Sequence, residues 1–233
     1  MIHYKKALLE LKKNKLKIYS EKVLADSSIN RISATNINSL NNYPAANNTA
    51  FDGFAINSQD TKNLNKKKTR KFKIIKTLAA GDNPNIKKVP KFSTIEVMTG
   101  AIIKKPFDTI IPIEQIRFLP NRTKPKYIVI NKKIHKHNFI RFIGSDFKKG
   151  ETIIKKGEII NSQHILAFKT LGIKEVVVKK KPKIVFYSTG NEISNSNKLP
   201  YWKIRNSNSY YLKSFFKNLP FEFIEKKILR DND

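Results

Sequence analysis

The chain has 233 residues, of which 39% are apolar, and it contains no cysteine; this composition allows a buried core but excludes disulfide scaffolds, thiolate metal sites and cysteine nucleophiles. The 47 lysines and arginines outnumber the 18 acidic residues and give a net charge of +29, which favours polyanionic or phosphorylated partners. Because the lysines are spread along the whole chain, a general compositional bias explains this charge better than a dedicated nucleic-acid surface does.

The N-terminal segment is predicted to be helical. An amphipathic helix is expected over 4–14, because apolar residues recur there at the spacing of one helix face, namely Tyr4, Leu8 and Leu11. A second short helix is expected to begin at Asp26 or Ser27, which are suitable N-caps, and to carry Ile29 and Ile32.

A β-rich module is predicted between residues 43 and 133. Short β-branched segments bounded by glycine or proline recur throughout this stretch, and such segments are typical of strands. The expected strands are 72–81, 93–100, 108–116 and 127–134.

A helix and a strand are predicted next along the chain. Asn161 or Ser162 is expected to cap the helix, and Gly172 suits the position just beyond its C-terminal end. The apolar face of this helix is predicted to include Ile165, Leu166 and Leu171. The segment "EVVV" (175–178) is then predicted to be a strand.

The C-terminal part predicts one β–loop–α–β crossover of a doubly wound parallel sheet. "KIVFY" (183–187) is a continuous apolar strand, as in buried parallel sheets, and "STGNEI" (188–193) is a tight turn after it. Ser207 or Asn208 is expected to cap a helix, and a second strand follows in 221–229. Two strands and one helix leave one sheet face bare, so we expect an incomplete domain whose other strands lie downstream or on a partner.

Glycines, hydroxyl groups and carboxylates recur together where these strands end. They occur as Asp52–Gly53, Thr99–Gly100, Arg141 with Asp146, and Ser188–Glu192. Each group alone is most simply a turn. Together they suit a phosphate or magnesium–phosphate ligand, because hydroxyls and backbone N–H groups donate to phosphate while carboxylates hold Mg²⁺.

Two histidines raise the question of a different metal site. His135 and His137 are two residues apart, so on a strand both would face one side. No third ligand accompanies them in the sequence, and a solvated strand edge is therefore the simpler interpretation.

Nothing in the sequence predicts membrane attachment. No apolar run reaches the roughly 18 residues that a spanning helix needs. The N-terminal stretch lacks the apolar region of a signal peptide. We therefore expect a cytoplasmic protein.

The order of the motifs resembles one known family. "YPAANNTAFDGFAI" (43–56), "VMTGA" (97–101) with "DTIIPIEQ" (108–115), and the stretch 140–178 follow the sequence order and spacing of the molybdopterin molybdenumtransferases, the MoeA and gephyrin E-domain family. The resemblance continues to the C-terminal end in three further segments: "KPKIVFYSTGNEI" (181–193), "IRNSN" (204–208) and "ILRDN" (228–232).

The resemblance implies a mixed α/β architecture with several domains. An elongated dimerisation segment would comprise 1–42 and 134–176, and the inserted β-rich module would comprise 43–133. Residues 177–233 would begin a doubly wound α/β domain like that of the MoaB and Mog proteins, truncated at its C-terminus. Family dimers pair through the elongated segment, so we expect a homodimer, or a complex with a chain that carries the missing C-terminal half.

The resemblance also implies an activity. The family inserts molybdate into adenylylated molybdopterin in a Mg²⁺-dependent reaction that releases AMP, and the loop matched by Asp52 enters the active site from the second subunit. Matched catalytic positions are Asp52, Thr99, Glu192 and Asp231. Matched substrate-binding positions are Ser188, Thr189, Gly190 and Arg141; for Arg141 a purely structural role is the alternative. The expected magnesium ligands are Asp146 and Glu192.

Several departures from the family pattern bear on this activity. Asn47, Asn191 and Asn206 stand where the family usually has aspartate, and the segments that contact molybdate are absent. We therefore expect that this chain does not complete catalysis unaided. A non-catalytic scaffold on the same fold is the alternative. A basic nucleic-acid-binding protein is a third, disfavoured reading, because no such motif is present and the aromatic residues are predicted to lie in apolar strands.

Overall fold

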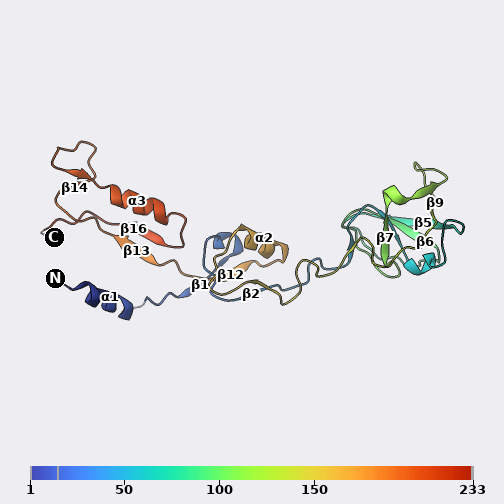
Figure 1. Ribbon diagram of the computed structural model, residues 1–233, viewed down its shortest axis with the longest axis horizontal. Helices are drawn as coiled ribbons and strands as arrows, with labels where there is room; N and C mark the ends of the chain where they lie inside the picture. Colours follow the sequence, from blue (N-terminus) through green and yellow to red (C-terminus); the bar gives the residue numbers. More distant parts are fainter. Residues whose placement is uncertain (1, 15, 232–233) are drawn as a thin grey trace. The chain divides into compact units, whose positions relative to one another are not determined.

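The computed structural model describes residues 2–14 and 16–231. Within them the chain forms two compact units, one from Met1–Asn38 and Thr152–Asp233 and the other from Ser39–Glu151. Figure 1 shows the helices and strands of each unit. The three-part division expected from the sequence stays a prediction, and its last two residues, 232 and 233, lie outside the described residues.

The unit of residues 39–151 is built on a sheet that comprises six strands in the described part of the chain. The spatial order is β7-β4-β6-β5-β9-β8; β5 and β6 run parallel, and the other neighbours run antiparallel. The strands are β4 (Gly53–Ile56), β5 (Arg70–Leu78), β6 (Ser93–Val97), β7 (Thr109–Pro112), β8 (Arg117–Leu119) and β9 (Tyr127–Ile130).

The four strands expected in this region are therefore present, but each ends earlier than predicted. Strand β6 ends at Val97, where a turn carries Thr99 and Gly100. Strand β7 ends at Pro112, which has no N–H to donate to a ladder, and the 3₁₀ turn η3 (Ile113–Gln115) follows. Further elements of this unit are β3 (Asn48–Thr49), which pairs with β10 (Ile140–Arg141), and the 3₁₀ turn η2 (Ser58–Thr61).

Strand β4 is buried on both faces of this sheet. Phe54 and Ile56 belong to one apolar cluster together with Phe72, and Ala55 belongs to another together with Val97. The two clusters arise because successive side chains of a strand point to opposite faces. This double burial explains why "FAI" in β4 is a continuous apolar run.

Gly53 is the first residue of β4 and is paired with Val97 on one side and Pro112 on the other. A Cβ atom placed on Gly53 would lie 2.1 Å from the carbonyl oxygen of Ile111. The turn expected at Asp52–Gly53 is therefore the start of a strand, and the close approach of β7 is what requires glycine there.

The other unit carries α1, α2 and α3 (Figure 1). In chain order its elements are α1 (Tyr4–Lys13), β1 (Ser20–Leu24), η1 (Ala25–Ser28), β2 (Ile37–Asn38), β11 (Thr152–Ile154), α2 (Ser162–Thr170), β12 (Glu175–Lys179), β13 (Lys183–Phe186), β14 (Ile193–Ser194), β15 (Ile204–Arg205), α3 (Ser207–Phe216) and β16 (Glu222–Glu225). β1 pairs antiparallel with β12, and β2 with β11. The helix predicted over 4–14 is confirmed as α1, although Tyr4 and Leu11 on its apolar face are each 72% exposed.

The prediction of a second helix is wrong, because only the 3₁₀ turn η1 forms in this segment. Asp26 and Ser27 lie inside η1 and do not precede a helix. Ile32, which was expected on that helix, forms an antiparallel bridge with Ile159 and accepts a hydrogen bond from the N–H of Lys179 at 2.8 Å. Pairing on both sides of Ile32 keeps this segment extended.

Helix α2 begins after Asn161, one of the two predicted caps. The Asn161 side chain accepts from the N–H of His164, and the Asn161 N–H donates to His164 Nδ1, each at 3.1 Å, which forms a capping box. Gly172 follows the helix with φ of +73°, as its predicted role requires. The predicted apolar face is wrong at Leu166, which is 70% exposed. The buried residues of α2 are instead Ala167 and Phe168.

Strands β13 and β16 run parallel, as predicted, and α3 lies between them in the chain. Phe216 of α3 stacks on Phe223 of β16 with 5.7 Å between ring centroids, and Phe223 stacks on Phe186 of β13 at 6.3 Å. One face of the strand pair is thus covered by α3. Val185 points to the opposite face and is 45% exposed, which agrees with the bare sheet face expected for two strands and one helix, although β13 is not buried on both sides as its continuous apolar sequence suggests.

The N-cap of α3 is Asn206, one residue before the earlier of the two predicted caps, Ser207 and Asn208. Its side chain is directed away from the helix. Asn206 Oδ1 accepts from Ser188 Oγ at 2.7 Å, and Asn206 Nδ2 points to Glu225 Oε1 at 3.5 Å. The residue therefore ties the turn after β13 to the end of β16.

Candidate functional site

Asp52 and Thr99, which the sequence predicts in one site, form a hydrogen-bonded pair. The backbone N–H and the hydroxyl of Thr99 both donate to Asp52 Oδ1, at 2.6 and 2.8 Å. Asp52 precedes β4 and Thr99 follows β6, so the pairing of these neighbouring strands brings the two residues together. Among the described residues, none donates a hydrogen bond to Asp52 Oδ2. The exposed carboxylate therefore keeps one oxygen open for a ligand.

The same contacts set the charge state of Asp52. The backbone hydrogen bond from Thr99, followed by the hydroxyl bond, lowers the pKa of the carboxyl below its ordinary value, and desolvation opposes this shift only in part. The Asp52 carboxylate therefore stays ionised down to a lower pH than an ordinary aspartate does. The main chain is fixed as well, because Ile113 N–H donates to the Asp52 carbonyl at 3.1 Å.

Arg141 and Asp146 lie in the same unit and form an ion pair. The Arg141 hydrogen bond lowers the pKa of Asp146, and Ser145, which donates to Asp146 Oδ1 at 3.0 Å, acts in the same direction. The Arg141 guanidinium also lies 5.8 Å from the centroid of the Tyr43 ring. The charge of Arg141 is therefore already compensated within the chain.

The remaining predicted residues gather in the other unit, around the turn after β13. Ser188 is buried and its hydroxyl is used by Asn206. The Gly190 N–H donates to the Leu229 carbonyl at 3.1 Å. Exposed Thr189 lies between them, at a parallel bridge with Leu229. Of these three positions, the Thr189 side chain is the one placed to meet a ligand.

Glu192 folds back over Gly190. Gly190 has φ of +128°, a backbone conformation that residues with a Cβ rarely adopt, so glycine suits this turn. Within the described residues the Glu192 carboxylate has no hydrogen bond or ion pair. Asp231 lies close by, because its N–H approaches the side-chain oxygen of Asn191 at 3.4 Å. The structure therefore brings Glu192, Asp231 and the 188–190 turn together.

Sequence reasoning did not place Asn206 or Glu225 in this cluster. The signal for Asn206 was the segment "IRNSN", in which it was noted as a replacement for aspartate. An asparagine suits this position because a carboxylate would stand beside Glu225. Asn206 also lines a cavity of about 350 Å³. Its other lining residues include Ser194, Asn195, Ser196, Arg205 and Tyr210.

The acidic residues of the site differ in how well they suit a magnesium ion. No group of three or more histidine, aspartate or glutamate side chains that could hold a metal ion occurs in 2–14 and 16–231. Mg²⁺ commonly takes only one or two carboxylates and completes its shell with water and substrate phosphates. The uncommitted carboxylate of Glu192 fits that role. Asp146 fits it less well, because a metal ion would have to displace Arg141.

The residues of the candidate site fall into two groups, one in each unit. Asp52, Thr99, Arg141 and Asp146 belong to the unit of residues 39–151. Ser188, Thr189, Gly190, Glu192 and Asp231 belong to the other unit. Each group is assembled by its own strands, and the convergence of the two groups on one ligand stays a prediction.

The placement of the aromatic residues bears on the nucleic-acid-binding alternative. The expectation that aromatic residues lie in apolar strands is wrong for Tyr201, Trp202 and Tyr211, which are 96%, 64% and 69% exposed. The placement of the aromatic residues therefore does not count against nucleic-acid binding. In the described part of the chain, no helix combines the length and the apolar character that crossing a membrane demands.

Comparison with known proteins agrees with the motif order. Residues 2–172 match the family model described as the MoeA N-terminal region, domains I and II. A curated relative, the molybdopterin molybdenumtransferase of Staphylococcus aureus strain Mu50, is 31% identical over 211 residues, which is 90% of this chain and 49% of that protein. The same enzyme of Staphylococcus epidermidis strain RP62A is 29% identical over 232 residues, 99% of this chain and 54% of that protein.

Solved structures are similar over the same extent. A molybdopterin biosynthesis MoeA protein from Pyrococcus horikosii superposes with a TM-score of 0.84 at 28% identity, covering 99% of this chain and 58% of that one. A second structure of such a protein, from Pyrococcus horikoshii OT3, gives a TM-score of 0.82 at 30% identity, covering 91% and 55%. The chain thus spans about half the length of the curated relatives it matches.

Proposed function

The chain belongs to the MoeA family, whose N-terminal region it matches over residues 2–172, and we propose that it acts in molybdenum cofactor biosynthesis as part of a molybdopterin molybdenumtransferase. The reaction proposed for the protein of full family length is insertion of molybdate into adenylylated molybdopterin with release of AMP. The observation that carries the proposal is the Asp52–Thr99 pair, an ionised carboxylate held by two donors on one oxygen and open on the other. Surplus positive charge supports it further, because both substrates are anionic.

We assign different tasks to the residues of the site. Glu192 would hold Mg²⁺ against the diphosphate of the substrate, and the metal would supply charge neutralisation for cleavage of that diphosphate. Exposed Thr189 would donate its hydroxyl to a phosphate oxygen. Ser188 and Gly190 act by shaping the turn, because their own hydrogen-bonding groups are used by Asn206 and Leu229.

Asp231 and the open oxygen of Asp52 complete the acidic part of the proposed site. Asp231 lies next to the turn through its contact with Asn191. We propose that Asp52 and Thr99 reach this site from the second copy in a homodimer, as the family resemblance implies. Residues 177–233 would then be the beginning of a doubly wound MoaB- or Mog-like domain, completed by further strands of the family fold in the same chain or on a partner, and the protein would work in the cytoplasm.

Binding of adenylylated molybdopterin in the presence of Mg²⁺ tests this proposal by calorimetry. We expect the wild-type chain to bind it, and Asp52→Asn and Glu192→Gln to weaken binding by about tenfold or more, the loss expected for one contact to a charged group. The Glu192→Gln loss should vanish when Mg²⁺ is removed, whereas the Asp52→Asn loss should persist. Glu10→Gln, which removes an exposed carboxylate of α1, is the matched control and should bind as the wild type does.

Absence of binding by the wild-type chain, or equal weakening in Glu10→Gln, would contradict the proposal. The proposed dimer has its own readout, because light scattering should give twice the 26.9 kDa mass of one chain. A non-catalytic scaffold on the same fold predicts the same dimer without Mg²⁺-dependent binding of the nucleotide.

A further inference from the structure

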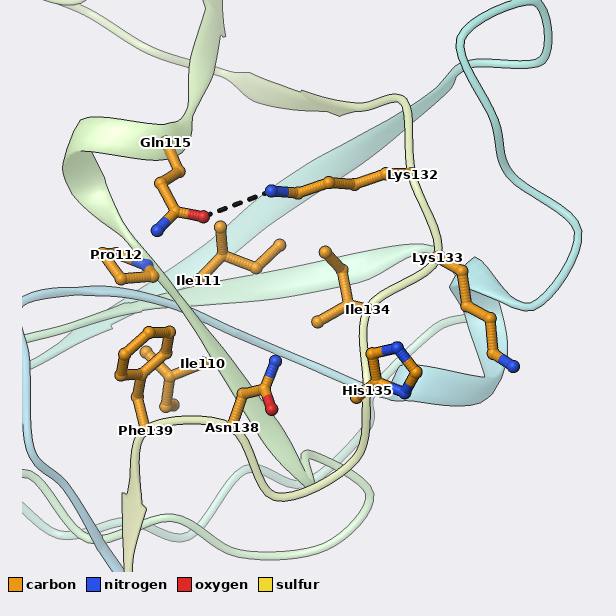
Figure 2. A pocket seen from close by; sticks show the side chains of 10 residues that line it. All are labelled: Ile110, Ile111, Pro112, Gln115, Lys132, Lys133, Ile134, His135, Asn138 and Phe139. Carbon is orange, nitrogen blue, oxygen red and sulfur yellow. Dashed lines mark hydrogen bonds between the residues drawn. The ribbon is translucent and has the colours of Figure 1, made fainter.

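A pocket of about 240 Å³ lies in the unit of residues 39–151, outside the acidic groups described above. Strand β7 and turn η3 form one wall, and the segment 132–139 forms the other (Figure 2). The floor is apolar, because Ile110, Ile111 and Ile134 are all at least 93% buried. The exposed ring of Phe139 extends this apolar surface to the rim.

Nitrogen donors meet over this floor. Lys132 Nζ reaches across the pocket to Gln115 Oε1 at 3.3 Å, which leaves the Gln115 amide nitrogen free to donate (Figure 2). Figure 2 also shows the Asn138 amide directed between Ile110 and Ile134. Lys132 and His135 line the pocket, no aspartate or glutamate does, and Lys133 borders it with a side chain that extends away from the floor (Figure 2). The ligand that complements these groups is an anion.

The walls are held in place before any ligand binds. Ile110 N–H donates to the Asn138 carbonyl at 3.1 Å, and Thr109 Oγ1 donates to the His135 carbonyl at 2.7 Å. His137 and Phe139, which flank Asn138, have φ of +73° and +56°, a left-handed backbone that residues other than glycine rarely adopt. Such local strain persists only where the surroundings impose it, and it is concentrated at ligand-binding positions.

We propose that this pocket binds a small organic monocarboxylate with a flat or short apolar body. One carboxylate oxygen would accept from Lys132 Nζ and the other from the amide of Asn138 or Gln115, while the apolar body lies on the isoleucines and Phe139. The volume lies below the range of about 300 Å³ and more that is usual for drug-sized ligands, so the body is no larger than a single ring. A preformed pocket of this kind loses little conformational entropy on binding.

The test uses the full ¹⁵N-labelled chain and NMR titration with benzoate as the probe. Benzamide is the neutral isostere, and inorganic phosphate is the anion without an apolar body. We expect saturable shifts from benzoate at amides in 110–115 and 132–139, and binding of benzamide and of phosphate that is weaker by about tenfold or more. Shifts from benzoate spread over lysines throughout the chain, or equal binding of benzamide or phosphate, would overturn the proposal.

Two neighbouring lysines supply a matched pair of variants. Lys132→Gln removes the ammonium that crosses the pocket, whereas Lys133→Gln makes the same change of charge at a side chain that extends away from it (Figure 2). We expect Lys132→Gln to weaken benzoate binding about tenfold and Lys133→Gln to leave it within about twofold. Equal weakening in both variants would show attraction to the basic surface in general and would sink the proposed site. Unchanged amide dispersion in the spectrum of each variant confirms that it is folded.

Discussion

Gly53→Ala tests whether strand packing is the reason for glycine beside Asp52. The added Cβ would lie 2.1 Å from the Ile111 carbonyl oxygen, and real Cβ atoms essentially never approach closer than 3.0 Å, so β7 must move by about 0.9 Å. That movement stretches the adjacent β4–β7 hydrogen bonds beyond bonding distance. Losing about two such bonds at about 1 kcal/mol each, together with about 1–2 kcal/mol for the disturbed packing of Ile111, predicts a loss of about 3–4 kcal/mol.

The assay is urea unfolding combined with native-state hydrogen exchange. Exchange is needed because a chain of two compact units does not have to unfold in one step. We expect the loss in Gly53→Ala to appear at amides of β4, β6 and β7. Gly81→Ala in the same unit is the matched control: Gly81 has φ of +88° and nothing within 4 Å of an added Cβ, so it should lose only about 1–2 kcal/mol from backbone strain.

A Gly53→Ala protein as stable as Gly81→Ala would refute the packing argument. It would mean that β7 yields to the new methyl group at little cost, and that glycine at this position serves the ligand-binding loop instead. The pKa of Asp52 in the same variant separates these readings further. It should rise toward its ordinary value if the shift of the strands pulls Asp52 away from Thr99.

Three further substitutions test single contacts. Thr99→Val removes the hydroxyl but keeps the backbone donor, so the pKa of Asp52 should rise only part of the way to its ordinary value of 3.8 in an NMR titration. Because the pKa of Asp52 is lowered in the folded protein, the Asp52–Thr99 pair stabilises the fold above pH 3.8. This stabilisation is lost as the pH falls through the pKa of the folded state. Asn206→Asp places a second carboxylate beside Glu225 Oε1, now 3.5 Å from the amide, and should lower the free energy of unfolding by about 2 kcal/mol in urea. Asn161→Ala removes the N-cap of α2 and should cost about 1 kcal/mol in the same measurement.

The sequence predicted those elements whose residues carry local signals. Helix α2 could be predicted because a capping residue, an apolar stretch and a terminal glycine agree, and each acts within a few residues of the chain. The parallel pair β13–β16 could be predicted because two apolar segments flank one helix of suitable length. Asp52 and Thr99 were expected in one site, from strand ends that carry a carboxylate and a hydroxyl, but the hydrogen bonds between them were not predicted.

Features that depend on distant partners were missed or predicted wrongly. The extended segment around Ile32 pairs with Ile159 and Lys179, residues more than a hundred positions away, so its local helix signal misled. The side of α2 that is buried depends on what packs against the helix, and Leu166 has enough apolar character to suggest the wrong face. The reason for Gly53 lies in the carbonyl of Ile111 on a neighbouring strand, which no local pattern reveals.

The two hydrogen bonds from Thr99 to one oxygen of Asp52 limit how this carboxylate can bind a ligand. Because Oδ1 already accepts hydrogen bonds from two donors, the carboxylate cannot bind a ligand through both oxygens unless it loses its hydrogen bonds to Thr99. It would therefore accept a hydrogen bond from a substrate group such as a hydroxyl through one oxygen only, in a direction set by strands β4 and β6. A contact through one oxygen depends closely on where that oxygen lies. A glutamate in place of Asp52 is longer by one methylene group and would move the carboxylate oxygen out of position.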